Sequence, residues 1–167
     1  SKKFYGVFAY TYFYSQFTTA MGNYLPSVWD SRHLISFSGG YKLKKNWEIS
    51  ARWRFSGKTP FVPVNQNATL SAYPEVVLDY NQLGNVKLDP FNLADVRFDK
   101  KWNFKRYSFN FYFEIQNFLA QAVPRPDEYG LNRTEEGNLI LPQSLVKVNT
   151  EENNNIPIPS FGFVIDF

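Results

Sequence analysis

The carboxylates Asp95, Asp99 and Glu114 have the clearest capacity for chemistry in this sequence, because neighbouring acids can transfer protons or hold a cation. A nucleophilic triad also needs a base, and His33 is the single His of a chain that has no Cys. Alternation puts His33 on the apolar side of a strand, and the sequence contains no Gly-x-Ser-x-Gly turn. We therefore predict that the chain is not an enzyme and holds no metal or cofactor, and we expect the acids to pair with arginines.

The segment YSFNFYFEIQNF, residues 107–118, indicates what kind of element positions Glu114. Apolar and polar residues alternate along it almost without interruption. Strand side chains point to opposite faces with a period of two, so this segment is predicted to be a strand with one apolar and one polar face. The aromatic content of the whole chain, 19%, also favours strands.

About six segments alternate in this way and are predicted to be strands. They cover residues 4–17, 31–43, 47–56, 91–102, 107–118 and 160–167. The first segment is so rich in aromatic residues that the sequence does not show which of its sides is the apolar one.

The connections between these segments alternate between short and long. Residues 44–46 and 103–106 are short polar turns, whereas residues 18–30, 57–90 and 119–159 are long links. In an antiparallel meander, this order places every short turn at one end and every long loop at the other. Outer-membrane β-barrels have this asymmetry. We therefore predict an all-β fold, and specifically an antiparallel up-and-down transmembrane barrel with long extracellular loops.

The two faces of such a barrel have different surroundings. The apolar positions are predicted to face lipid, namely Trp47, Ile49, Trp53, Phe55, Phe109, Phe111, Phe113, Phe161, Phe163 and Ile165. The charged positions are predicted to face a wet lumen, namely Glu48, Arg52, Arg54, Asp95, Arg97, Asp99 and Glu114. Trp47, Trp102 and Tyr107 lie beside the short turns, where we expect them to form an aromatic girdle at the membrane interface.

Charge and hydropathy exclude other classes. The net charge of +3, without a long Lys/Arg cluster, gives no reason to expect a nucleic-acid partner. No apolar run approaches the ~18 residues of a membrane helix, whereas a barrel strand needs only ~9–11 residues. Residues 1–10 do not resemble a signal peptide, so we expect either a mature chain or a part of a longer one. The alternative hypothesis is a soluble β-sandwich that binds carbohydrate through Trp and Tyr.

Three stretches together resemble the C-terminal end of TonB-dependent outer-membrane receptors, most closely those of Bacteroidetes. These are residues 26–61, residues 93–118 and the terminal SFGFVIDF. The matching motifs are Trp29-Asp30-x-Arg32-His33, Gly40-Tyr41 before a Lys-rich turn, Arg54-Phe55-Ser56-Gly57 leading to Thr59-Pro60-Phe61, Asp95-x-Arg97-x-Asp99-Lys100, and Ile115 to Phe118. Their order and spacing cover most of the chain.

The resemblance implies energised nutrient uptake, for example of a glycan or siderophore, across the bacterial outer membrane. It also implies a barrel of about 22 strands around a plug, driven by an inner-membrane complex through TonB. No segment of the sequence resembles the plug or the TonB box, so we expect residues 1–167 to be the last part of a larger barrel. The implied partners are outer-membrane lipid, the remaining barrel and plug, the TonB complex and a surface lipoprotein.

Function in such a receptor concentrates in loops on a rigid scaffold. The residues that we expect to contact ligand in the long loops are Tyr24, Trp29, Asn65, Gln66, Tyr73 and Tyr129, although passive solvated loops would have a similar composition. The resemblance also implies that the final aromatic residue, Phe167, is part of a signal that the barrel-assembly machinery recognises. The alternative role of Phe167 is an anchor in lipid.

Overall fold

The computed structural model describes residues 3–148 and 155–167. Most of the secondary structure is β-strand. The main sheet is antiparallel, with its strands in the order β1-β4-β5-β6-β7-β10. Its strands are β1 (Phe4–Tyr12), β4 (His33–Lys42), β5 (Trp47–Ser56), β6 (Phe91–Asn103), β7 (Ser108–Gln116) and β10 (Ile158–Asp166). The all-β prediction is confirmed. The sheet is open, with β1 and β10 as its edges, and the described strands do not close into a barrel.

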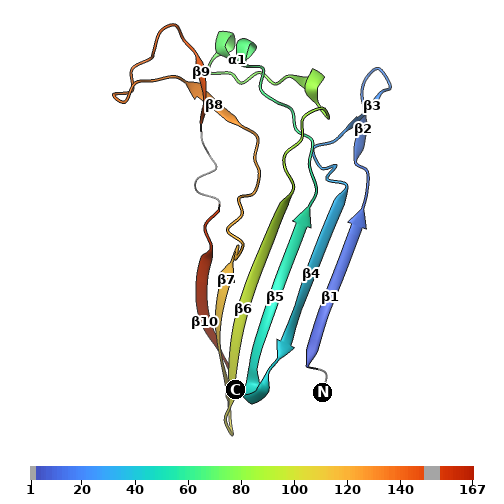
Figure 1. The fold of residues 1–167 in the computed structure, drawn as a ribbon, viewed down its shortest axis with the longest axis vertical. Coiled ribbons are helices and arrows are strands. Elements are labelled where there is room, and N and C mark those ends of the chain that lie inside the picture. The colour runs from blue at the N-terminus through green and yellow to red at the C-terminus, as the bar shows by residue number, and fades with distance from the viewer. Residues whose placement is uncertain (1–2, 149–154) are drawn as a thin grey trace.

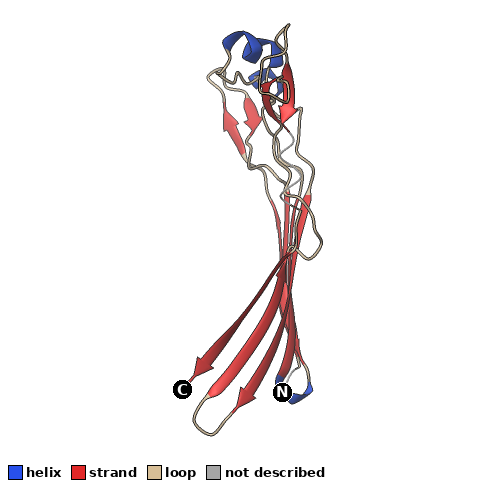
Figure 2. Cartoon of the chain, turned by 90° about the vertical axis from the view of Figure 1, so that its left-hand side faces the viewer, coloured by secondary structure: helices blue, strands red, loops and turns tan. Residues whose placement is uncertain are grey.

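The sheet is a single twisted layer (Figure 2). Within residues 3–148 and 155–167, no aliphatic or aromatic side chain other than Pro60 is buried. A soluble domain of this length normally encloses a hydrophobic core. Hydrogen bonds between neighbouring strands therefore hold the described sheet together, rather than packing between two layers.

The two short turns lie at the same end of the sheet, which we call the short-turn end (Figure 1). Between β4 and β5, the short helix η1 (Lys44–Asn46) makes the turn, and the N–H of Leu43 donates to the carbonyl of Trp47 at 2.8 Å. Lys45 and Asn46 have φ of 59°, a conformation that Asn tolerates better than most residues. Between β6 and β7, the N–H of Phe104 donates to the carbonyl of Tyr107, and their rings stack at 4.6 Å.

The opposite end of the sheet, the loop end, carries the long connections and some structure of their own (Figure 1). The first connection contains a hairpin of β2 (Gln16–Thr18) and β3 (Tyr24–Pro26). The second contains α1 (Gln66–Ala72) and the short helix η2 (Tyr80–Gln82), and the third contains β8 (Glu128–Leu131) paired with β9 (Leu145–Val148). In the described ranges, the helices are too short and too polar to cross a bilayer.

Four predicted strand bounds differ from the observed ones by two residues or more, since the second strand begins at His33 instead of residue 31 and the sixth at Ile158 instead of residue 160. The first strand ends at Tyr12 instead of at residue 17, because its partner β4 begins at His33 and residues 16–18 pair with β3. Between these two pairings, the carboxylate of Asp30 accepts a hydrogen bond from the N–H of Ser15. The fifth strand ends at Gln116 instead of at residue 118, because Asn117 adopts a φ of 51° and its N–H donates to the carboxylate of Asp95.

Two tyrosines lie flat across glycines of the neighbouring strand. Tyr5 is directly opposite Gly40, and a Cβ built on Gly40 would lie 2.5 Å from the Tyr5 hydroxyl oxygen. Tyr112 is directly opposite Gly162, where a Cβ would lie 2.5 Å from the Tyr112 hydroxyl oxygen. An aromatic ring that covers a strand glycine compensates for the missing side chain and helps to define the register. Gly40 also lets Tyr5 reach across β4 and donate a hydrogen bond to Glu48 on β5.

The contact between Tyr5 and Gly40 predicts the effect of Gly40→Ala. The new methyl group would displace the ring and remove the hydrogen bond to Glu48, so we expect the free energy of unfolding to fall by about 1–3 kcal/mol. Urea unfolding of the purified protein in detergent micelles measures this. Gly130→Ala is the matched control, because its Cβ would meet Val148 at an ordinary 3.4 Å. Equal stability of the two variants would contradict the role of Gly40.

Candidate functional site: the two faces of the sheet

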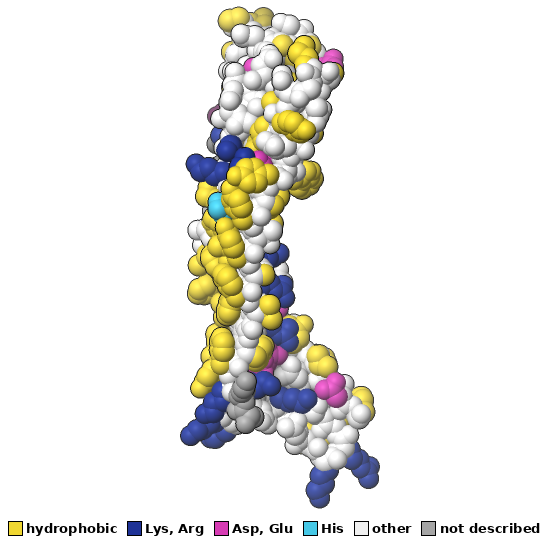
Figure 3. Space-filling model, turned by 90° about the vertical axis from the view of Figure 1, so that its right-hand side faces the viewer, with side chains coloured by type: hydrophobic (Ala, Val, Ile, Leu, Met, Phe, Trp, Pro, Cys, Tyr) yellow, Lys and Arg dark blue, Asp and Glu magenta, His cyan; other side chains and the backbone are white. Residues whose placement is uncertain are grey.

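One face of the sheet carries hydrophobic residues on every strand, and we call it the apolar face. Seen from the β1 edge, hydrophobic side chains gather along one side of the sheet (Figure 3). The register aligns one row across all its strands, namely Phe4, Tyr41, Ile49, Phe98, Phe113 and Phe161. Every residue predicted to face lipid is on this face, namely Trp47, Ile49, Trp53, Phe55, Phe109, Phe111, Phe113, Phe161, Phe163 and Ile165. Even on the central strands, Ile49 and Phe113 are 38% and 37% exposed.

The register also decides which side of β1 is apolar. Phe8 is opposite Phe37 and Tyr10 is opposite Ile35, so these residues of β1 extend the apolar face. The other side of β1 carries Tyr5, which joins the polar network through Glu48. Because directly opposite residues of an antiparallel pair share a face, the pairing with β4 resolves what alternation within β1 left open.

The reverse side of the sheet, the polar face, carries the residues predicted to face a lumen. These are Glu48, Arg52, Arg54, Asp95, Arg97, Asp99 and Glu114. The register puts opposite charges on neighbouring strands, with Arg97 opposite Glu114 and Arg52 opposite Asp95. Opposite charges that face each other across two strands stabilise the pairing.

Arg97 is the centre of the polar face. Its Nε and one terminal nitrogen bind the two carboxylate oxygens of Asp99, each at 2.8 Å. The guanidinium carbon lies 3.9 Å from the centre of the Tyr112 ring, and another terminal nitrogen lies 3.8 Å from Glu114. Asn110 donates a further hydrogen bond of 2.9 Å to Asp99. The two-pronged contact lies within β6 and fixes the orientation of the guanidinium. The contacts with Tyr112, Glu114 and Asn110 join this pair to β7.

A second, looser charge cluster surrounds Asp95. Arg54 lies 3.9 Å from its carboxylate, and the backbone N–H of Asn117 donates to it at 3.1 Å. The Arg54 side chain is 53% exposed, so this ion pair contributes little to stability. Arg52, although opposite Asp95 in register, forms no ion pair with any described residue.

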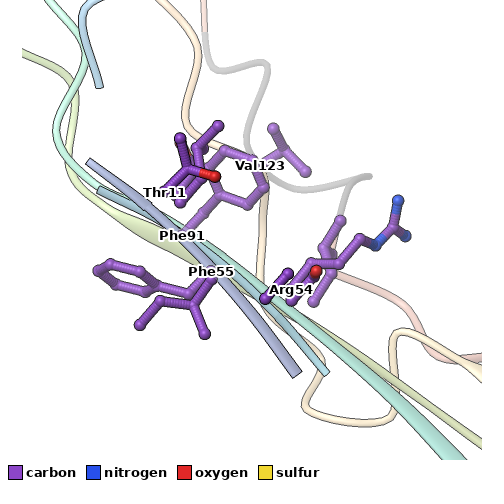
Figure 4. A pocket seen from close by; sticks show the side chains of 11 residues that line it. Thr11, Arg54, Phe55, Phe91 and Val123 are labelled. Carbon is purple, nitrogen blue, oxygen red and sulfur yellow. The ribbon is translucent and has the colours of Figure 1, made fainter. Parts of the chain in front are cut away.

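Toward the loop end, the polar face becomes apolar around a hollow of about 500 Å³ (Figure 4). The side chains that line it on this face include Ala9, Thr11, Leu34, Phe91, Leu93 and Val123. Figure 4 shows Phe91 and Thr11 on one side of the sheet and Phe55 on the other. No sequence pattern was assigned to this hollow. Phe91 and Leu93 have the same parity as Asp95, and this parity alone would have placed them on the polar face.

Asp30 is the most buried charged residue of the described chain, at 2% exposure, and it organises the loop end next to β4. It accepts hydrogen bonds from the N–H of Ser15 and from Nε of Arg32, at 3.2 and 3.0 Å. The Arg32 guanidinium also lies 4.0 Å from the centre of the Tyr14 ring. Burial lowers the pKa of Arg32. The hydrogen bond to Asp30 and the negative charge of Asp30 outweigh this effect and raise the pKa of Arg32 above its ordinary value.

His33 opens β4 on the apolar side, where alternation places it. Its Nδ1 lies 2.9 Å from the hydroxyl of Tyr10, and its ring centre lies 5.0 Å from that of Tyr12. Among the residues that the structure describes, no carboxylate forms a hydrogen bond or ion pair with His33 to orient it as a base, and its side-chain contacts are with Tyr10 and Tyr12. In the described ranges, no group of His, Cys, Asp and Glu side chains could hold a metal ion.

The residues expected to contact ligand come from three different connections at the loop end (Figure 1). Tyr24 is on β3 and Trp29 follows it, and both are strongly exposed, at 70% and 76%. Asn65 caps α1, because its side-chain oxygen accepts from the N–H of Ala68 at 3.1 Å. Gln66 is the first residue of α1, Tyr73 follows its end, and Tyr129 is on β8, half-buried.

The second connection is folded upon itself. Thr69, at 1% exposure, both accepts from the N–H of Val77 and donates to its carbonyl. A Cβ built on Gly84 would lie 2.6 Å from the Pro26 ring, so this connection also contacts the β2–β3 hairpin. The loops at this end are therefore partly structured and partly joined to each other.

Comparisons with protein-family models, with curated proteins and with solved structures found no match to this chain.

The contacts of Arg97 predict that Arg97→Gln will destabilise the sheet, because Asp99 and Glu114 would lose the cation between them. We expect the free energy of unfolding to fall by about 1–3 kcal/mol. Arg52→Gln is the matched control on the neighbouring strand, and its effect should stay within about 0.5 kcal/mol. Urea unfolding in detergent micelles compares the two. A fall of the same size in both variants would mean that net charge, rather than the Arg97 contacts, is what matters.

Proposed function

We propose that this chain forms the C-terminal wall and part of the extracellular loops of a TonB-dependent outer-membrane receptor. The observation that carries the proposal is the single-layer sheet whose Phe, Trp and Ile face has no protein covering it in the described part of the chain. Hydrocarbon is the solvent in which such a face is favourable, whereas water would make so large an exposed apolar surface prone to aggregation.

The lengths of the strands support a membrane-spanning role. The strands of the main sheet contain 9 to 13 residues, and a tilted strand needs ~9–11 residues to cross the hydrocarbon layer. The short turns are at one end and the long connections at the other, as in outer-membrane barrels, whose short turns are periplasmic and whose long loops are extracellular.

The open edges support a larger barrel. An unpaired row of N–H and C=O groups in lipid costs several kcal/mol for each group, so β1 and β10 need strand partners there. β1 runs away from the short-turn end and β10 runs toward it. Further strands can therefore pair with both edges in the same antiparallel order.

The role in uptake rests on the resemblance together with the position of the loops. Energy would come from the TonB complex, and a plug would occupy the lumen and contact the polar face. A nutrient such as a glycan or siderophore would enter at the loop end, near Tyr24, Trp29, Asn65, Gln66, Tyr73 and Tyr129, with a surface lipoprotein as a further partner. The alternative, a soluble carbohydrate-binding sandwich, requires a second packed sheet, and nothing in the described strands favours it.

Spin labels on neighbouring residues test the membrane placement. In a cysteine-free background of the intact protein, Trp53→Cys and Phe111→Cys place a label on the apolar face. Arg52→Cys and Asn110→Cys place it on the polar face. In proteoliposomes we expect the first pair to collide mainly with dissolved oxygen and the second with a water-soluble nickel chelate, because oxygen partitions into hydrocarbon. Equal accessibility to the nickel chelate on both faces would overturn the proposal.

The assembly role of Phe167 is a separate proposal. Phe167 follows β10 and is fully exposed, at 100%. We expect Phe167→Ser to lower the amount of the protein in the outer membrane severalfold, while the unfolding midpoint of the purified protein stays the same. Phe167→Trp is the control, because it keeps an aromatic residue at the end of the chain. Normal membrane levels of Phe167→Ser would contradict an assembly role and favour a lipid anchor.

A further inference from the structure

The short-turn end of the sheet gathers positive charge that has no carboxylate partner in the described chain. We call this set the basic rim, and it consists of Lys3, Lys42, Lys44, Lys45, Lys100, Lys105 and Arg106. Figure 3 shows Lys and Arg side chains projecting from this end of the molecule. The acids nearby are engaged with other groups, since Glu48 binds Tyr5, Asp99 binds Arg97 and Asp166 binds Lys101.

The loop end has a different charge balance. Its cations Arg32 and Lys58 pair with Asp30 and Asp89, at 3.0 and 3.6 Å, and Lys147 on β9 pairs with Asp127. The other described cations without a carboxylate partner are spread over separate strands and loops. The sheet is therefore electrically asymmetric along the strand direction, with its free positive charge concentrated at one end.

Lys100 connects the basic rim to the apolar face. The register places it on that face, opposite Trp47 on one side and Phe111 on the other. Its Nζ lies 5.3 Å from the Trp47 ring centre and 5.4 Å from that of Trp102, and it donates a hydrogen bond to the carbonyl of Lys45. A Lys whose stem lies on apolar surface directs its charged end toward the polar boundary. Two indoles hold the ammonium at that boundary.

We propose that the basic rim binds the phosphate of an anionic phospholipid, such as phosphatidylglycerol, from the membrane leaflet at the short-turn end. Lys100 contacts the phosphate from the apolar face, and Lys44 and Lys45 contact it from the turn. The acyl chains extend from Lys100 toward the middle of the strands, over Phe98 and Phe113 on the same face. This inference rests on the proposed membrane placement.

The continuity between cations and apolar surface is what favours a lipid. Free phosphate would be attracted to the lysines, but it would make no favourable contact with the apolar face beside Lys100. A soluble acidic protein would have to cover an apolar surface that extends along the whole strand. A molecule with an anionic head and hydrocarbon chains matches the basic rim and the apolar face at once. Each basic residue near an anionic leaflet typically raises the affinity by a factor of roughly five.

Spin-labelled phospholipids test this in vesicles of phosphatidylcholine that contain the intact protein. We expect immobilised phosphatidylglycerol to be preferred over immobilised phosphatidylcholine by roughly threefold to tenfold, and 0.5 M NaCl to weaken the preference. In Lys44→Gln/Lys45→Gln/Lys100→Gln the ratio should fall close to one. The triple Lys→Arg variant, which keeps the charges, should retain the preference, and Lys58→Gln/Lys87→Gln at the loop end should leave it unchanged. Millimolar inorganic phosphate should not displace the lipid.

The outcomes separate the two proposals. Immobilised phosphatidylcholine without any preference for phosphatidylglycerol would overturn the lipid site and leave the membrane placement intact. An equal loss of the preference in Lys58→Gln/Lys87→Gln would also overturn the lipid site, because net charge rather than the basic rim would then cause the preference. Displacement of the lipid by inorganic phosphate would overturn it too, because the lysines would then bind phosphate without the acyl chains. The absence of any immobilised lipid would overturn both proposals.

Discussion

Strand-to-strand pairing is the interaction on which this structure depends, because the described chain encloses no hydrophobic core. Each inner strand of the main sheet pairs on both sides, and the rows of side chains on each face follow from that register. A single layer leaves both faces to their surroundings. In the membrane placement that we propose, an apolar medium contacts one face, and water or polar protein contacts the other.

Contacts across neighbouring strands take the place of a core. Tyr5 spans Gly40 to reach Glu48, and Tyr112 lies between Gly162 and the guanidinium of Arg97. These contacts lie on the polar face, where hydroxyl, carboxylate and guanidinium groups can bind each other with defined geometry. The apolar face carries mainly aromatic side chains, with the hydrogen bond between Tyr10 and His33 toward the loop end and Lys100 between two indoles at the short-turn end.

The two ends of the sheet differ as much as the two faces. The loop end carries partly structured connections and paired charges such as Asp30 with Arg32. The short-turn end carries tight turns, indole rings and unpaired lysines. In the proposed receptor, this asymmetry would orient the sheet relative to the membrane, with ligand contact at the loop end and anchoring at the short-turn end.

Period-two alternation was sufficient to predict strands β4, β5, β6, β7 and β10 and the side of the sheet for the residues that it assigned, because a strand has only two faces. It could not assign β1, whose residues are aromatic on both sides, and it extended that strand past Tyr12, where the pairing with β4 ends. Register, which brings together residues distant in the chain, decided those points. It also placed Lys100 between two indoles and Tyr5 over Gly40, since contacts between strands depend on pairing that no local pattern contains.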